Sequence, residues 1–102
     1  MGRISANGVG FKIPLQSVTS VGRGDDCALR LAYREVSANH AEIRWSGDHW
    51  ELRDLESSNG TLINDEVVET GTWHPLEEGD WIAFGHFQIR YRLVDDGPPK
   101  GG

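Results

Sequence analysis

Hydrophobic and polar residues alternate along short segments of this chain, and turn-forming residues separate the segments. The clearest case runs from Trp50 to Leu55, where the alternation places Trp50 and Leu52 on the face that we expect to be buried. This period of two is typical of a half-buried β-strand. No window of the sequence has the apolar spacing of a convincing amphipathic helix. The pattern therefore predicts an all-β fold.

About ten segments have this character, and most are rich in β-branched and aromatic residues. The expected strands are Arg3–Ala6, Phe11–Leu15, Thr19–Gly22, Leu29–Leu31, Ala41–Trp45, Trp50–Leu55, Thr61–Ile63, Val67–Val68, Trp81–Phe84 and Phe87–Leu93. Asn7-Gly8 and Ser46-Gly47-Asp48 are turn signals, so we expect hairpins at both places. So many short strands form either a two-sheet sandwich or a small closed barrel. We choose the sandwich.

Length and composition limit what such a chain can be. With 102 residues it fits one domain. Four Trp residues are expected to fill the core or cap its ends. The net charge of −6 disfavours unselective binding to nucleic acid or to an anionic membrane. A single cysteine, Cys27, excludes an internal disulfide and favours a reducing compartment. We expect an intracellular protein, cytoplasmic or nuclear.

The end of the chain differs from the rest. Residues 95–102 contain two Pro and three Gly residues and no apolar anchor, so we expect a linker or a disordered tail. Residues 1–94 are then the folded domain. We expect the tail to lead into another part of a larger protein. No apolar run approaches the ~18–20 residues of a membrane span.

Three segments between expected strands combine anion-binding side chains with turn formers. They are Gly22-Arg23, Ser37 to His40, and Ser57 to Thr61. Loops at strand ends are where β-sandwiches carry binding residues. An Arg supplies a planar cationic fork, while hydroxyl groups and turn N–H groups supply neutral donors for the remaining oxygens of a phosphate. The three segments together predict a phosphate site.

In order and spacing, these segments resemble the forkhead-associated (FHA) domain, a family of phosphothreonine-peptide-binding modules. The matching motifs are Gly22-Arg23, Ser37-x-x-His40, and Ser58-Asn59-Gly60-Thr61 with Asn64 following. The resemblance extends from about Arg3 to Leu93. It implies an FHA/SMAD-like β-sandwich of about eleven short strands. It also implies a function in binding phosphothreonine in a partner protein, within a larger kinase-signalling protein.

The resemblance assigns roles to individual residues. It implies that Arg23 and Ser37 bind the phosphate and that Ser58 adds a polar contact. Asn59 is expected to hold the main chain of the peptide, with Asn39 and Arg34 as further peptide-binding residues. The residues expected to support the site are Gly22, His40, Gly60, Thr61 and Asn64.

The sequence departs from the family pattern at two places. The family often carries Arg or Lys where this chain has Asn39, and Ala38 has no side chain that can hydrogen-bond a ligand. Arg34 or Arg30 could supply the missing charge. After Asn64, acidic Asp65-Glu66 replaces a Gly that is frequent in the family. A phosphate-independent protein-protein interaction domain therefore stays open as the alternative. We expect Ala32–Val36 and Asn64–Val67 to set the preference for particular residues on either side of the phosphothreonine.

Catalysis and metal binding have little support in the sequence. Ser57 and Ser58 lie near Asp54 and Glu56, but there is no Gly-x-Ser-x-Gly elbow and no Ser-Lys pair. The histidines show no ligand-like spacing to one another or to Cys27; they are His49, His74 and His86, besides His40. We expect no enzyme activity, no cofactor and no metal. We also expect no nucleic-acid partner and no direct membrane contact.

Overall fold

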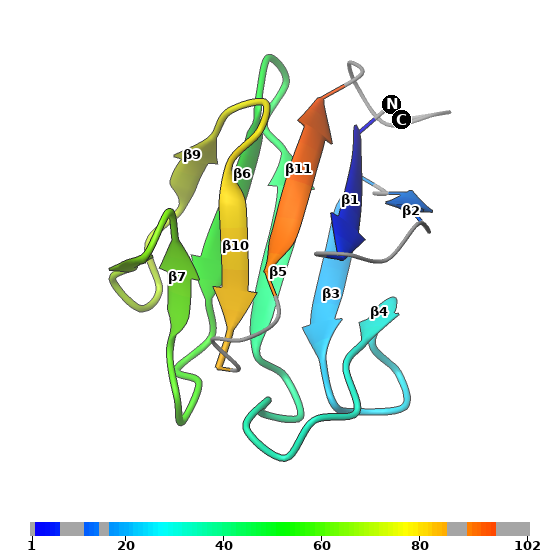
Figure 1. Ribbon diagram of the computed structural model, residues 1–102, viewed down its shortest axis with the longest axis vertical. Coiled ribbons are helices and arrows are strands. Elements are labelled where there is room, and N and C mark those ends of the chain that lie inside the picture. Colours follow the sequence, from blue (N-terminus) through cyan, green and yellow to red (C-terminus); the bar gives the residue numbers. More distant parts are fainter. Residues whose placement is uncertain (1, 7–11, 15–16, 86–89, 96–102) are drawn as a thin grey trace.

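The computed structural model describes residues 2–6, 12–14, 17–85 and 90–95, with side chains over residues 17–85 and 90–93. The expected turn at Asn7-Gly8, and Phe11, Leu15 and residues 86–89 of the expected strands, lie outside the described residues. Within them the chain forms strands and no helix (Figure 1). The strands are β1 (Gly2–Ala6), β2 (Lys12–Pro14), β3 (Val18–Gly22), β4 (Leu29–Arg30), β5 (Ala41–Trp45), β6 (Trp50–Asp54), β7 (Thr61–Ile63), β8 (Glu66–Val67), β9 (His74–Leu76), β10 (Trp81–Phe84) and β11 (Tyr91–Asp95).

The strands form two sheets, as expected for a sandwich. A six-stranded sheet has the order β2-β1-β11-β10-β7-β8, and a five-stranded sheet has the order β4-β3-β5-β6-β9. Strands β1 and β2 pair antiparallel, and so do β5 and β6, as the predicted hairpins require. Strands β3 and β4 pair in parallel. The prediction of an all-β, two-sheet sandwich is confirmed.

Strand β9 is the one element that the hydrophobic pattern did not predict. It is three residues long, contains Pro75, and pairs with β6 at the edge of its sheet. Proline lacks an N–H group and is found in edge strands, so a proline-containing triplet gives little strand signal in the sequence. Two boundaries also move. Strand β8 lies one residue earlier than expected, and β11 continues to Asp95.

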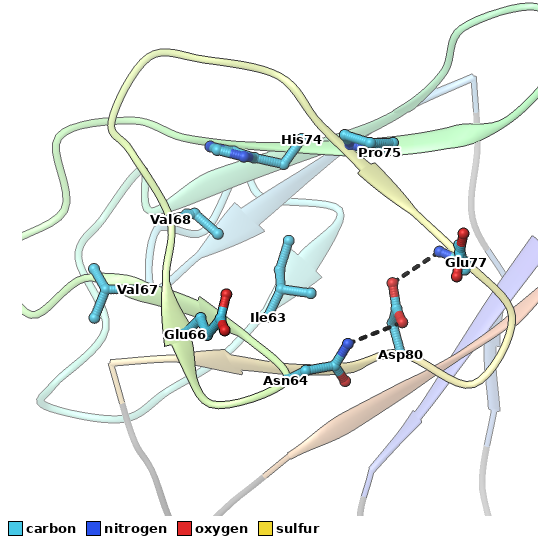
Figure 2. A pocket seen from close by; sticks show the side chains of 9 residues that line it. All are labelled: Ile63, Asn64, Glu66, Val67, Val68, His74, Pro75, Glu77 and Asp80. Atoms are coloured by element: carbon cyan, nitrogen blue, oxygen red, sulfur yellow. Dashed lines mark hydrogen bonds between the residues drawn. The ribbon is translucent and has the colours of Figure 1, made fainter.

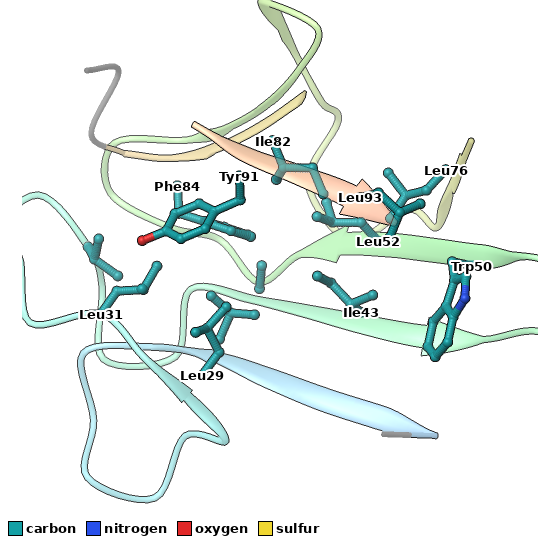
Figure 3. Packing of buried hydrophobic residues seen from close by; sticks show 13 residues of the cluster. Leu29, Leu31, Ile43, Trp50, Leu52, Leu76, Ile82, Phe84, Tyr91 and Leu93 are labelled. Atoms are coloured by element: carbon teal, nitrogen blue, oxygen red, sulfur yellow. The ribbon is translucent and has the colours of Figure 1, made fainter. Parts of the chain in front are cut away.

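The core lies between the two sheets. Trp50 and Leu52 are fully buried, as the alternation predicted, and they pack with side chains from the opposite sheet (Figure 3). Apolar burial of this kind is the main favourable term in folding. The buried cluster consists of Val21, Leu29, Leu31, Val36, Ala41, Ile43, Trp50, Leu52, Leu76, Ile82, Phe84, Tyr91 and Leu93.

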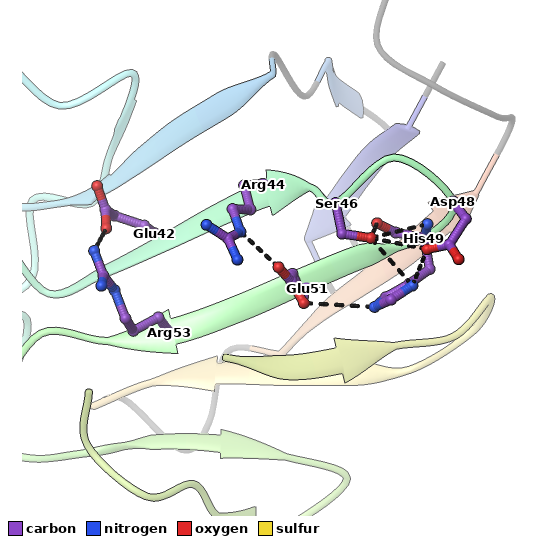
Figure 4. A network of polar contacts seen from close by, with 7 residues as sticks. All are labelled: Glu42, Arg44, Ser46, Asp48, His49, Glu51 and Arg53. Carbon is purple, nitrogen blue, oxygen red and sulfur yellow. Dashed lines mark hydrogen bonds and ion pairs between the residues drawn. The ribbon is translucent and has the colours of Figure 1, made fainter. Parts of the chain in front are cut away.

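The outward face of β5 and β6 carries a polar network instead (Figure 4). Glu42 pairs with Arg53, and Arg44 pairs with Glu51, across the two strands. Trp73 packs on this face, with the Arg44 guanidinium carbon 3.8 Å from its ring centroid and that of Arg53 at 4.6 Å. Trp73 therefore lies on the outside of the sheet, where sequence alone had it filling the core or capping its ends, because two cations over an indole ring offer it a favourable place there.

The strand register brings several loops to one end of the sandwich. Ala41, the first residue of β5, pairs with Val21 on one side and with Asp54 on the other. The loops that follow β3, precede β5 and follow β6 thus leave the same end of the five-stranded sheet. Thr61 starts β7 opposite Phe84, the last residue of β10. These loops lie together at the lower end of Figure 1.

Replacing Leu52 by alanine tests the core. Leu52 is fully buried in the cluster, so Leu52→Ala should lower the free energy of unfolding by ~2–5 kcal/mol through lost burial and the cavity left behind. Urea denaturation measures this. The matched control is Val18→Ala, because Val18 is 53% exposed and should change stability by no more than about 0.5 kcal/mol. Equal effects of the two changes would contradict the assignment of the core.

Candidate functional site

The loop after β3 and the loop before β5 are joined by their backbones. The Arg23 N–H donates to the Ser37 carbonyl at 2.9 Å, and the Gly24 N–H donates to the Ala38 carbonyl at 3.1 Å. Gly22 makes this approach possible, since a Cβ built there would lie 2.2 Å from the Ala38 oxygen. A side chain at position 22 would force the two loops apart.

Ser37 connects the third loop to the other two. Its hydroxyl accepts a hydrogen bond from the Ser58 N–H at 3.0 Å. A second link is made by Asn59, whose Nδ2 donates to the Glu35 carbonyl at 2.8 Å. The three segments that sequence motifs identified are therefore one connected surface.

His40 lies beneath these loops and is fully buried. Its Nδ1 accepts the Ser37 N–H at 3.1 Å, so in the neutral ring Nε2 carries the proton and donates to the Gly60 carbonyl at 2.8 Å. The ring also meets Phe84 edge-on, with centroids 5.9 Å apart. One imidazole thus connects the loop before β5 to the turn before β7.

The surroundings of His40 favour its neutral form. Burial lowers the pKa of His40 below its ordinary value, and the Gly60 carbonyl and Asp54 oppose this shift only in part. A second proton would have to enter at Nδ1, which is the acceptor for Ser37. Protonation therefore breaks a loop contact and places a charge in a buried position.

Asp54 organises the turn before β7 from inside. It is 2% exposed, and its carboxylate accepts hydrogen bonds from the Ser57 N–H and hydroxyl, from the Thr61 hydroxyl and from the Thr70 hydroxyl. Burial raises the pKa of this carboxyl, but the hydrogen bonds from Ser57, Thr61 and Thr70 outweigh burial and hold the pKa below its usual value.

In the sequence, Asp54 stood out only as a neighbour of the serines, and its structural role was not predicted. The available signal was its place three residues before Ser57 in a turn, where an Asp side chain commonly accepts local backbone N–H groups. Gly85 was also missed. A Cβ there would lie 2.4 Å from the Glu35 carbonyl oxygen, so the end of β10 packs directly against the loop before β5.

The side chains with an expected ligand role lie on the outside of the connected loops. They are exposed or, for Ser37, half-buried; they are Arg23, Arg34, Ser37, Asn39, Ser58 and Asn59. The side chain of Arg23 has no hydrogen bond or ion pair to any residue that the structure describes. Arg30 is differently placed, because it pairs with Asp25 at 3.0 Å and donates to the Arg23 carbonyl at 3.2 Å. Their roles toward a ligand stay predictions.

Asn64 does not join this group. It lies at the opposite end of β7, where its Nδ2 donates to Asp80 and its Oδ1 accepts the Trp81 N–H, each at 3.0 Å. It therefore braces the turn after β7 against the turn before β10, away from the phosphate-binding candidates.

Among the residues whose positions are described, no group of three or more His, Cys, Asp or Glu side chains could hold a metal ion. The described part of the chain also has no helix long and apolar enough to cross a membrane.

Comparison with known proteins identifies the family. The model of the FHA domain matches residues 19–85. The chain belongs to the FHA domain family. This FHA domain is 44% identical over 73 residues to the FHA domain-containing protein FhaA of Mycobacterium tuberculosis, covering 72% of this chain and 13% of that protein. It thus spans a small part of that relative's length.

Two solved structures are similar over nearly the whole FHA domain. One comes from a structural and functional study of phosphothreonine-dependent FHA domain interactions; it has a TM-score of 0.80 and 32% identity, covering 94% of this chain and 97% of that one. The other is the FhaA FHA domain complexed with the intracellular domain of a second protein, with a TM-score of 0.79 and 34% identity, covering 91% and 99%.

The buried imidazole predicts a pH dependence of stability. The pKa of His40 is ~6.5 in the unfolded chain, and folding lowers it. The unfolded state therefore binds the proton more readily than the folded state. Stability from this group is present above pH ~6.5 and falls as the pH decreases toward the folded-state pKa, by at most about 1.4 kcal/mol per pH unit. Denaturant unfolding of the wild type and of His40→Gln between pH 7.5 and 5 measures the free energy of unfolding at each pH. The variant should be less stable at pH 7.5 and show a shallower decline; parallel curves would contradict the assignment.

Proposed function

We propose that this FHA domain binds phosphothreonine-containing segments of partner proteins through the loops that carry Arg23, Ser37 and Ser58. The observation that carries the proposal is the double contact of Ser37. Its carbonyl accepts the Arg23 N–H, and its hydroxyl accepts the Ser58 N–H. These contacts fix the backbones of Arg23 and Ser58 against Ser37 before any ligand arrives, which lowers the entropic cost of binding.

The chemistry of the three side chains fits a phosphate. Arg23 offers a planar fork of N–H donors, and the hydroxyl groups of Ser37 and Ser58 offer neutral donors for other oxygens. Because Ser37 Oγ accepts from Ser58 N–H, its own proton remains available to a ligand. In a chain with a net charge of −6, such a site attracts anions locally while the whole molecule does not.

The peptide around the phosphothreonine would be held mainly by Asn59. Its Nδ2 is engaged by the Glu35 carbonyl, which fixes the amide and leaves Oδ1 to accept a main-chain N–H group of the peptide. Asn39 and Arg34 are exposed in the adjacent loop and are proposed as further peptide contacts. Residues 32–36, on the same loop, are proposed to set the preference for particular peptide residues on either side of the phosphothreonine.

We further propose that the domain acts by binding alone and serves an intracellular protein of a kinase-signalling system. Support comes from the studied relatives, since one similar structure concerns phosphothreonine-dependent interactions and another is a complex with an intracellular domain. Phosphorylation of the partner would then switch the interaction on, because the phosphate supplies the charge that Arg23 recognises.

Removing the Arg23 side chain tests the phosphate site. Charge-assisted hydrogen bonds are worth ~1.5–3 kcal/mol each, so Arg23→Ala should weaken phosphothreonine-peptide binding by about a hundredfold or more, measured by calorimetry. The matched control is Arg92→Ala, an exposed Arg on β11 that contacts Trp81. Both variants should keep the wild-type free energy of unfolding within about 0.5 kcal/mol. Unchanged affinity in folded Arg23→Ala would contradict the site, and tight binding of the unphosphorylated peptide would favour the phosphate-independent alternative.

Selectivity for the phosphorylated residue gives a second test. The extra methyl of threonine is worth roughly 0.8 kcal/mol when buried, about fourfold in affinity, and more where its absence leaves a rigid void. The loops are cross-connected, so we expect at least about tenfold preference for phosphothreonine over phosphoserine in otherwise identical peptides. A peptide with glutamate in place of the phosphothreonine should bind poorly, because a planar carboxylate cannot satisfy the donors arranged for a tetrahedral phosphate. Equal calorimetric affinities for the threonine and serine forms would contradict a rigid methyl pocket.

A further inference from the structure

A groove of about 510 Å³ opens on the side of the sandwich where both sheets end. Strand β8 is the last strand of the six-stranded sheet, and β9 is the last strand of the five-stranded sheet. The groove lies between them and extends to the turn before β10 (Figure 2). It is lined by Ile63, Asn64, Glu66, Val67, Val68, His74, Pro75, Glu77 and Asp80.

The lining combines aliphatic surface with carboxylates. Figure 2 shows Ile63 in the middle of the groove, with His74 and Pro75 along one side and Glu66 and Asp80 along the other. Val67, beside it on β8, is 74% exposed and, with Val18, is one of two exposed large hydrophobic residues in the described part of the chain. An exposed aliphatic side chain at the edge of a groove is a feature of interaction surfaces.

Hydrogen bonds fix one end of the groove. Asp80 accepts from Asn64 Nδ2 at 3.0 Å through one carboxylate oxygen and from the Glu77 N–H at 2.8 Å through the other. Asn64 and Asp65 form the turn after β7 with φ values of 52° and 69°. Positive φ at both positions is the conformation that favours a two-residue hairpin loop, and Asn and Asp adopt it more readily than other non-glycine residues. The groove is therefore a built feature of the fold.

The charge of the groove is not neutralised by the described residues around it. Asp65, just outside, pairs with Arg90 at 2.8 Å, whereas the carboxylates of Glu66 and Glu77 have no cationic partner within the described part of the chain. A ligand that brings positive charge would supply that partner. A bound metal ion is disfavoured, since no metal-holding group of three side chains occurs among the described residues.

The two edge strands also favour an extended ligand. An edge strand presents backbone groups that another extended chain can pair with. Strand β9 contains Pro75, which has no N–H to donate, so β8 is the better edge. Strand β8 is antiparallel to β7, so it runs back toward the turn that carries Asn59. Val67 Cγ1 lies 4.0 Å from the position that a Cβ on Gly60 would take. Val67, which lines the groove, therefore also lies close to the turn that carries Asn59.

From these observations we propose that this groove is a second, phosphate-independent docking site. It binds an extended segment of a partner protein in which Lys or Arg residues alternate with aliphatic residues. The aliphatic side chains pack on Ile63 and Val67, and the cationic groups meet Glu66 and Glu77. The proposal requires no phosphate and does not depend on the role of Arg23.

Binding of a defined probe peptide tests the groove in the intact chain. The probe is an acetylated and amidated peptide of alternating Lys and Val residues. Two controls replace its Lys by Glu or its Val by Ser. Titration is followed by backbone amide signals, and only the Lys-Val peptide should give saturable shifts, centred on residues 63–68 and 74–80. Shifts centred on Arg23 and Ser37, no saturable binding of the Lys-Val peptide, or equal binding of a control peptide would overturn the proposal.

Substitutions in the groove separate specific docking from general attraction to an acidic protein. The paired change Glu66→Gln with Glu77→Gln should weaken Lys-Val binding about five- to tenfold, and Val67→Ser should weaken it about threefold. The matched control, Asp26→Asn with Glu56→Gln, removes the same charge from exposed positions outside the groove and should leave the affinity within about twofold. Equal weakening by both pairs would overturn the assignment of the groove.

Discussion

The hydrogen bonds of the buried His40 imidazole are the constraint on which the loop end of this FHA domain, the candidate binding site, depends. The ring accepts from Ser37 and donates to the Gly60 carbonyl, so two loops that are 20 residues apart in sequence share one rigid contact. Neither loop contains regular secondary structure that could fix it. Since an unsatisfied buried polar group costs ~1–3 kcal/mol, the contact defines one arrangement of the loops and disfavours others.

Close backbone approach provides the rest of this rigidity. Gly22 and Gly85 each lie against a loop carbonyl at a distance that no side chain would permit. Asp54 meanwhile receives hydrogen bonds from three residues of the neighbouring segments. The exposed phosphate-binding candidates therefore stand on a layer of buried polar contacts whose members are satisfied by one another, and this layer needs no ligand to form.

Alternation of side chains predicted the sandwich and the burial of Trp50 and Leu52, because the apolar residues of the buried face and the polar residues of the exposed face alternate along a half-buried strand. Strand β9 was not predictable, since Pro75 removes the strand signal and an edge position leaves few apolar requirements. The motifs identified the loops, but they did not predict the hydrogen bonds between the loops. Asn64 belongs to the same family motif and yet lies at the other end of β7, and the groove beside it depends on where both sheets end. Such features depend on contacts between distant segments.

The separation between buried and exposed layers has an evolutionary consequence. Exposed loop residues such as Arg34 and Asn39 are not among the buried groups that hold the loops in place. Substitutions on the outer layer therefore cost little folding free energy, typically within about 0.5 kcal/mol, while they alter the surface proposed to meet a partner. A lineage can change the sequences that such a domain recognises by single surface mutations, without passing through unfolded intermediates. The buried layer, in contrast, tolerates few changes, so the same scaffold can diversify its partners while its loop framework stays constant.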